Sequence, residues 1–420
     1  MRLTAAASLE AAQAARALAL AEALMLRNPD DRIALNIAAR GALQVGRPDK
    51  TLRYSKRLFR TSQSDRERFA AARTAALALA SSENFTRAQI WLRRARQLAP
   101  DEAARAAVGR DYRVLRARNP LRFQFDVGIS PSSNINNGSS EDGFEFLGVP
   151  IGFTPDARAL SGLEFSFTGN VEFKLHQTGR RLTTLSASST ASRYALSPPS
   201  AEAAPNFDAA DLDRTRLGVE LQHQWATSGR DDPANIAIGV ELAHFAGDPY
   251  AREVALSGGR TWHLSDETGI HGQLALARTT YLQTDTTSRQ WDASLRWSRE
   301  LDEGKRLHLF AGAGETLSDT DSLRSRRRHI GIGYDFGRVA DRFDIGLGFS
   351  HVWRDYEPSL LTPEGRHDRQ VKASVTLGMP MVEVYGFQPE TRFELQDTAS
   401  NTARYDTQSL SVDFGFRSAF

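Results

Sequence analysis

From Leu121 to the end of the chain, apolar residues recur at every second position, and this alternation constrains the fold more than any other feature. In the last stretch, Leu410, Val412, Phe414 and Phe416 share one parity, while polar residues and glycine occupy the other. Side chains of a strand point alternately to its two faces, so the pattern gives one apolar and one polar face. Such segments are typical of transmembrane barrel strands. A soluble β-sandwich is the alternative.

The alternation predicts a transmembrane β-barrel over residues 119–420. Fourteen strands are expected, at about 121–130, 161–177, 180–196, 212–227, 233–247, 250–263, 267–281, 285–299, 304–318, 322–336, 340–355, 365–378, 382–398 and 403–420. An even number suits a closed antiparallel barrel whose two ends lie on one side. Closure matters because an open sheet edge in lipid leaves backbone groups without partners.

The expected connections alternate in length and thereby predict the orientation. Short turns are expected near Thr178-Gly179, Gly229-Arg230, Ser265-Asp266, Glu303-Gly304, Gly337-Arg338 and Met379-Pro380. The opposite end carries longer connections at 131–160, 197–211 and 356–364. Bacterial outer-membrane barrels combine short periplasmic turns with longer outer loops. The chain is therefore expected in a bacterial outer membrane, with residue 121 starting in the periplasm.

Strand parity also predicts which charged residues face the barrel lumen. A Lys or Arg facing lipid near the midplane costs about 2–4 kcal/mol, so charged residues within the strands are expected to point inward. The candidates are Glu164, Glu172, Lys174, Arg216, Glu220, Glu241, Asp292, Arg296, Asp344, Lys372 and Arg417. They carry both signs of charge.

Two further groups are expected to act at the membrane. The aromatic residues Phe414, Phe416 and the terminal Phe420 are typical of a final strand that the bacterial barrel-assembly machinery inserts. Near the outer end of another strand, Arg324, Arg326 and Arg328 share the outward parity of its apolar residues. Arginine binds phosphate well, so lipopolysaccharide is their expected contact. A solvated rim is the alternative for these arginines.

Residues 1–118 show a helical pattern rich in Ala, Leu and Arg, and helix is expected from Ala5 onward. Turn signals recur at 28–31, 62–65 and 99–102, with inner turns at 46–49 and 82–85. A period near 34 residues is typical of tetratricopeptide repeats. The fold class is therefore a TPR-like helical domain followed by the barrel, with the helices stacked into a concave protein-binding surface. Ser64 and Asp101 are expected to cap helices.

Charge divides the chain in the same way. Residues 1–120 contain 23 Lys or Arg and 11 Asp or Glu, a net charge of +12, and the remaining residues have a net charge of −10. Oppositely charged halves suggest two domains in different surroundings. A basic helical surface could bind nucleic acid, but the attached barrel argues against such a partner.

The chemistry of an enzyme is not expected. Cysteine is absent, the nine His form no metal-binding motif, and no Gly-x-Ser-x-Gly motif occurs. We therefore predict no catalytic residue, cofactor or metal. No run of about 18 apolar residues marks a membrane helix. Residues 1–24 lack the apolar core of a signal peptide. Because an outer-membrane protein must be exported, Met1 is expected to be a mature, truncated or misassigned start.

The start of the barrel resembles a known family. Ser133, Asn134, Ile135 and Asn136 match the Ser-Asn-Ile-Asn-like segment that follows the first strand in the Slam-type surface lipoprotein assembly modulators. Domain order, strand number and the terminal Phe agree with that family. The resemblance implies a translocator that moves a surface lipoprotein, or a secreted haem-binding protein, across the outer membrane. It also implies a periplasmic helical domain that engages the client, with periplasmic chaperones as further partners. The helical domain is short for the family.

Two other functions remain open. An export pore for polysaccharide could use the repeats as a scaffold, and a lumen of one sign of charge would favour it. The mixed signs of the lumen candidates favour a protein client instead. An outer-membrane enzyme is the second alternative, and the missing motifs argue against it.

Overall fold

The computed structural model describes residues 1–146, 149–226, 232–359 and 362–418. Contacts divide the chain into two units. One contains Met1–Arg122 and Glu383–Phe387, and the other contains Phe123–Val382 and Gln388–Arg417. Among the described residues, no helix combines the length and the apolar character needed to cross a membrane.

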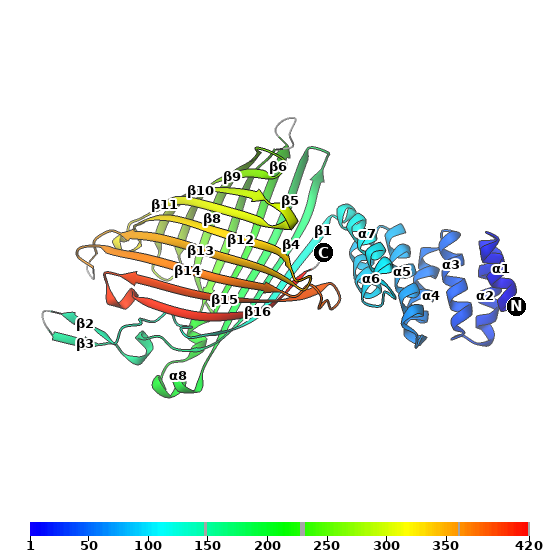
Figure 1. The fold of residues 1–420 in the computed structure, drawn as a ribbon, viewed down its shortest axis with the longest axis horizontal. Helices are drawn as coiled ribbons and strands as arrows, with labels where there is room; N and C mark the ends of the chain where they lie inside the picture. Colours follow the sequence, from blue (N-terminus) through cyan, green and yellow to red (C-terminus); the bar gives the residue numbers. More distant parts are fainter. Residues whose placement is uncertain (147–148, 227–231, 360–361, 419–420) are drawn as a thin grey trace. The chain divides into compact units, whose positions relative to one another are not determined.

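The helices predicted for the N-terminal region are confirmed. They are α1 (Arg2–Glu10), α2 (Ala14–Arg27), α3 (Arg32–Gln44), α4 (Pro48–Thr61), α5 (Asp65–Ser81), α6 (Phe85–Gln97) and α7 (Glu102–Arg118), stacked in order in Figure 1. All five predicted turns fall at junctions between helices, and four of them include the first residues of the next helix. The continuous helix expected from Ala5 is wrong, because Ala12 has a φ of +57° that separates α1 from α2. The TPR-like character of the stack stays a prediction.

The caps differ from the expectation at one helix. Asp101 begins α7 by accepting a hydrogen bond from the Ala104 N–H at 2.7 Å, as predicted. Ser64 precedes α5, but its side chain makes no capping hydrogen bond, so that prediction is wrong. Asp31 is a cap that was not predicted, and its carboxylate accepts hydrogen bonds from the N–H groups of Ile33 and Ala34 at the start of α3.

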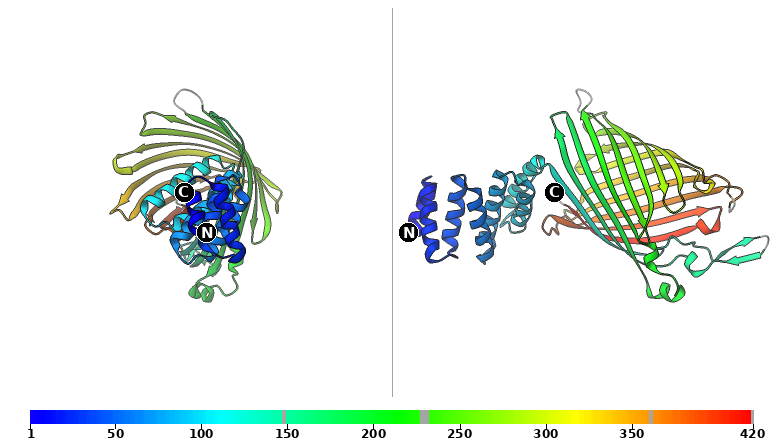
Figure 2. Two further views of the ribbon diagram at one scale, coloured as in Figure 1. Left: turned by 90° about the vertical axis from the view of Figure 1, so that its right-hand side faces the viewer. Right: turned by 180° about the vertical axis from the view of Figure 1, so that it is seen from behind.

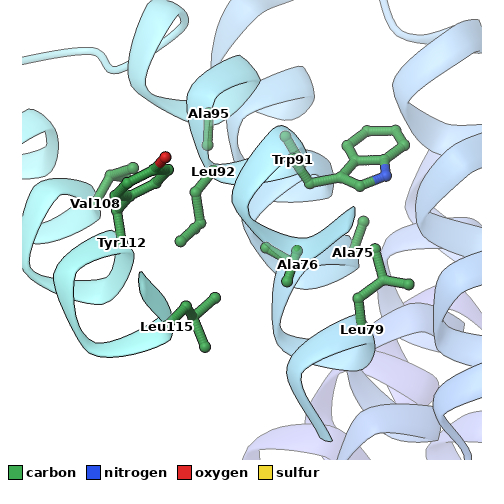
Figure 3. Close-up of a cluster of buried hydrophobic side chains, with 11 residues drawn as sticks. Ala75, Ala76, Leu79, Trp91, Leu92, Ala95, Val108, Tyr112 and Leu115 are labelled. Atoms are coloured by element: carbon green, nitrogen blue, oxygen red, sulfur yellow. The ribbon is translucent and has the colours of Figure 1, made fainter. Parts of the chain in front are cut away.

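Small residues hold the second half of the helical stack together. In Figure 3, Ala75 and Ala76 of α5 leave room for Leu92 and Trp91 of α6, and Tyr112 of α7 lies on the other side. Phe59 of α4 meets the Trp91 ring edge-on, with ring centroids 5.2 Å apart. The alanine and leucine residues of this helical pattern thus form the packed interface between successive helices.

A polar contact joins α2 to α4 within the first half of the stack. Glu22 accepts hydrogen bonds at 2.7 Å from both the Lys50 ammonium and the Tyr54 hydroxyl. Burial, together with the bond to Glu22, raises the pKa of Tyr54 to about 12. Burial opposes ionisation of Glu22, but the bonds from Lys50 and Tyr54 outweigh it and lower the Glu22 pKa.

Replacing the Asp31 cap should weaken α3. Asp31→Ala is expected to lower the stability of this helix by about 1–2 kcal/mol, because two helix N–H groups lose their acceptor. Its ion pair with Arg2, at 2.7 Å, is lost as well. Burial raises the Asp31 pKa, but the bonds from Ala34 and Arg2 outweigh it and lower the pKa below 3.8. The stabilisation of α3 by ionised Asp31 should therefore persist above pH 3.8 and disappear as the pH falls through the lowered Asp31 pKa.

Hydrogen exchange of residues 32–44 in the full chain measures this effect. Ser64→Ala is the matched control, since that side chain makes no capping bond, and α5 should change by less than about 0.5 kcal/mol. An equal loss of exchange protection, in α3 of Asp31→Ala and in α5 of Ser64→Ala, would show that the Asp31 cap does not stabilise α3.

The predicted barrel of fourteen antiparallel strands is confirmed. Its strands are β1 (Leu121–Ser132), β4 (Gly162–Gln177), β5 (Arg181–Leu196), β6 (Arg214–Ala226), β7 (Pro233–Phe245), β8 (Asp248–His263), β9 (Thr268–Tyr281), β10 (Thr286–Glu300), β11 (Arg306–Ser318), β12 (Ser325–Val339), β13 (Phe343–Tyr356), β14 (Arg366–Gly378), β15 (Phe387–Ser400) and β16 (Thr407–Ser418). Neighbours in sequence pair with each other, and β1 pairs with β16 to close the barrel. Figures 1 and 2 show the strands side by side around the closed sheet.

Two of the expected short turns differ in detail, one by its position and one by its length. The pair Gly337-Arg338 lies within β12, next to a bulge, and the chain reverses after it at Ala340 and Asp341, both of which have φ near +50°. β15 begins only at Phe387, so the connection at Met379-Pro380 is not tight. The expected turn Gly229-Arg230 lies outside the described residues.

The long connections contain structure that the sequence analysis missed. Between β1 and β4 lies a small hairpin of β2 (Gly143–Phe146) and β3 (Val149–Gly152), followed by the short helix η1 (Pro155–Ala157). Between β5 and β6 lie α8 (Pro198–Ala203) and η2 (Ala209–Leu212). These connections lie at one end of the barrel, which we call the long-loop end, and the other is the short-turn end.

Candidate functional site

The barrel wall has two chemically distinct faces. One face carries rows of exposed large apolar residues, such as Ile238 on β7, Leu256 on β8 and Leu276 on β9, which stand in register. This is the outward face, because residues of the opposite parity on these strands line a cavity inside the closed sheet. An apolar exterior of this extent marks contact with lipid or protein. The opposite parity of each strand lines the lumen.

The structure places all the lumen candidates of the sequence analysis on the inward face, and several form ion pairs or hydrogen bonds there. Glu164 accepts a hydrogen bond from Ser192 at 2.7 Å, and Lys372 pairs with Glu394 at 2.7 Å. Ion pairs also join Glu241 to Arg216 (3.6 Å), Asp292 to Arg327, and Asp344 to both Arg338 and Arg417. Glu172, Lys174, Glu220 and Arg296 lie on the same face by strand parity.

At the short-turn end, one arginine binds both a neighbouring strand and a more distant one. Arg417 of β16 lies 3.3 Å from Asp344 of β13 and 3.2 Å from Glu390 of β15. β14 and β15 lie between β13 and β16 in the sheet, so the Arg417 side chain crosses the inner wall. Arg338 of β12 also binds Asp344, so two guanidinium groups share this carboxylate.

Near the long-loop end, the inner wall forms a polar cavity of about 380 Å³. Its lining includes Arg216, Glu241, Glu253, Tyr281, Arg327 and Tyr356. Arg327 of β12 reaches over β11 to Asp292 of β10. Gly314 of β11 leaves the space for this bond, since a Cβ there would lie 2.7 Å from the Asp292 carboxylate. The cavity therefore has both donors and acceptors and suits a polar or mixed-charge segment.

The aromatic part of this cavity was not predicted. Tyr281 ends β9 and Tyr356 ends β13, and only the barrel register brings them to one cavity. Their inward parity was readable from the neighbouring apolar residues. Their proximity was not, because the order of strands around a closed wall fixes it.

The four residues of the family motif tie the first long loop to the barrel. Asn134 is buried, donates to the carbonyl groups of Gly138 and Gln408, and accepts from the Gly138 N–H at 2.8 Å. Asn136 donates to the carbonyl groups of Asp156 and Arg158 at 2.9 and 2.7 Å. The two side-chain amides thus supply hydrogen-bond partners to backbone groups of the loop.

The other two motif residues complete the same tie. Ile135 is buried, and its N–H donates to the Leu160 carbonyl at 2.7 Å. Ser133 exchanges hydrogen bonds with Leu410 of β16, through its own N–H and through its hydroxyl oxygen. The motif therefore fixes where the loop leaves β1 and how it rests beside β16.

The predicted membrane residues lie as follows. Phe414 and Phe416 point outward and are 52% and 54% exposed, whereas Phe420 lies outside the described residues. Arg326 and Arg328 are also outward, but each has a carboxylate partner at 2.9 Å, namely Glu315 and Asp355. Arg324 precedes β12 and binds loop groups.

The partners of Arg324 are the Ser318 carbonyl at 2.6 Å, Glu357 at 3.3 Å and Asp321 at 3.1 Å. The proposed contact of Arg324, Arg326 and Arg328 with lipopolysaccharide stays a prediction. Within the described part of the chain, no group of three or more metal-ligating residues gathers in one place.

Comparison with known proteins gives structural matches only. No family model and no curated protein sequence matches the chain. A BenF-like porin from Pseudomonas fluorescens Pf-5 matches with 8% identity and a TM-score of 0.41, over 71% of this chain and 98% of the porin. OccAB3 from Acinetobacter baumannii has 6% identity and a TM-score of 0.39, over 70% and 98% of the two chains.

A third match is OmpT, an outer membrane protein of Vibrio cholerae. It has 8% identity and a TM-score of 0.37, over 71% of this chain and 99% of that protein. The similarities are distant, and the barrel described above rests on the strand pairing of this chain itself.

Proposed function

We propose that this protein is a bacterial outer-membrane channel that moves a lipoprotein or secreted protein to the cell surface. The observation that supports it most is the closed barrel with an apolar exterior and a charged interior. A sheet with such an exterior needs lipid around it, and closure leaves no edge unpaired there. The interior offers polar partners to a transported chain.

The loops support an orientation. β1 begins and β16 ends at the short-turn end, because the strands are antiparallel and even in number. Longer connections are typical of the outer side of such barrels. We therefore place the helices α1–α7 in the periplasm. There, their net charge of +12 would attract an acidic client at low salt.

The lumen charges favour a protein client over an acidic or neutral polymer. The inner wall alternates signs over short distances, as in the Lys372, Glu394 and Arg392 group. A wall of one sign would suit a charged polysaccharide, whereas paired charges can exchange partners with both kinds of side chain. Tethering a client-binding module to the channel raises the effective client concentration at its mouth. Covalent catalysis forms no part of this proposal.

Co-expression in a heterologous Gram-negative host tests the function. The client is the lipoprotein or secreted protein encoded beside this gene, and its exposure at the surface is read by protease added to intact cells. We expect exposure with the full chain and loss of most of it when residues 1–118 are deleted, because the client is no longer recruited.

Heat-modifiable migration of the barrel is the control for assembly in both strains. Equal client exposure without this protein would overturn the translocator proposal. Equal exposure with the barrel alone would place recognition in the barrel, and transport of polysaccharide without client exposure would favour the scaffolded export pore.

A further inference from the structure

The outward face of β8, β9 and β10 changes from apolar to cationic near the long-loop end. Arg278 of β9 stands directly opposite Arg289 of β10. The preceding outward pair is Leu276 and Trp291. Arg252 lies on the outward face of the adjacent β8, and all three arginines are exposed.

This arrangement places like charges side by side. Directly opposite residues of an antiparallel pair have Cβ atoms about 5 Å apart, and like charges there are destabilising. Among the described residues, none of the three arginines has a carboxylate in ion-pair range. Glu315 on the neighbouring β11 is occupied, because it accepts from Arg326 at 2.9 Å and from the Trp291 indole at 3.3 Å.

An apolar groove of about 400 Å³ adjoins the arginines on the same face. Val254, Leu256, Leu276 and Leu317 line it with the Trp291 ring, and Arg278 and Arg289 belong to the lining as well. A ligand that fits this surface needs an apolar chain and an anionic group at one end of it. A second outward groove, around Leu347 and Phe393, has no arginine among its lining residues.

We propose that this surface, Arg252, Arg278 and Arg289 with the adjoining groove, binds a diphosphorylated glycolipid of the lipid A type. A phosphate would accept hydrogen bonds from Arg278 and Arg289 and relieve their repulsion, while an acyl chain fills the groove. Three guanidinium groups match a head with two phosphates better than the single charge of a phosphodiester. The choice of the outer-leaflet lipid rests on the proposed membrane orientation.

Native mass spectrometry of the full chain in detergent tests the site. The probes are diphosphoryl lipid A, phosphatidylcholine and inorganic pyrophosphate. We expect the wild-type protein to retain lipid A in preference to the other two. The double variant Arg278→Gln/Arg289→Gln should bind it at least about tenfold more weakly, because charge-assisted bonds to phosphate are lost.

The matched control is Arg180→Gln/Arg342→Gln, which removes the same charge from exposed turns at the short-turn end and should bind like the wild type. Unchanged binding by the Arg278/Arg289 variant would overturn the site, and so would equal retention of phosphatidylcholine. Equal binding of pyrophosphate would mean that the arginines hold any anion without a lipid.

The wild-type selectivity decides the question even if the double variant fails to fold. Heat-modifiable migration reports folding separately. A folded barrel without lipid A selectivity would overturn this site and leave the channel proposal standing. Normal lipid A selectivity together with failed client exposure would overturn the channel proposal and leave this site standing.

Discussion

Leu274→Arg is expected to destabilise the barrel in a bilayer by about 2–4 kcal/mol, whereas Gln273→Arg should have a much smaller effect. The two residues are neighbours in the middle of β9. Leu274 faces outward and is 51% exposed, so an arginine there would lie in the hydrocarbon layer. At position 273 the new side chain would enter the polar lumen, where acidic groups are present.

Refolding into phospholipid vesicles measures this difference. Urea titration gives the free energy of unfolding, and the fraction of heat-modifiable protein reports barrel closure. Equal losses for the two variants would contradict the assignment of faces. If both variants were as stable as the wild type, the apolar face would not contact lipid, and the membrane proposal would fail with it.

The strand count and faces were predictable because one physical rule acts on every strand. Each residue of β9 or β13 faces either the apolar surroundings or the lumen. Apolar and polar residues must therefore alternate along the whole strand. Positions such as Glu164 and Asp344 follow from parity alone. Helix turns were predictable for a similar reason, since proline and polar residues interrupt a regular apolar stripe.

Turns and loops were less predictable because their residues obey no period. Gly337 suggested a turn, but a bulge in β12 absorbs it and the reversal occurs at Ala340 and Asp341. Likewise, the segment before Phe387 looks apolar enough for a strand, yet Glu383 binds Arg96 of α6 instead. Long-range contacts of this kind leave no local pattern.

The arginine sites show the same limit. Arg324, Arg326 and Arg328 attracted notice because they are close in sequence, and two of them lie on the outward face with acidic partners. Arg278 and Arg289 are far less conspicuous in the sequence. Their cluster arises only from the register of β9 with β10, which the sequence does not specify to the residue.

Gly138→Ala is expected to loosen the first long loop, residues 133–161, by about 1–3 kcal/mol. A Cβ at Gly138 would lie 2.1 Å from the carbonyl oxygen of Arg158. The obstacle is backbone, so a side-chain rotation cannot remove it. Both Asn134 and Asn136 bind groups on either side of this contact, and a displaced Gly138 would break their hydrogen bonds.

Trypsin reports the opening directly, because Arg158 is the single Lys or Arg in residues 133–161. Cleavage after Arg158 in the reconstituted protein should become about 5- to 140-fold faster, since each 1.4 kcal/mol raises the open population tenfold. Gly152→Ala is the matched control in the same loop. Its Cβ would meet only the Asp142 carbonyl, at 3.9 Å, so cleavage should stay at the wild-type rate.

The comparison separates two roles for the motif at Ser133–Asn136. If Gly138→Ala speeds cleavage after Arg158 and also prevents client exposure in cells, the loop must keep its shape for transport. Faster cleavage with normal transport would limit the motif to holding the loop. Unchanged cleavage in Gly138→Ala would contradict the close backbone contact itself, and with it the account of the motif as the tie between this loop and β16.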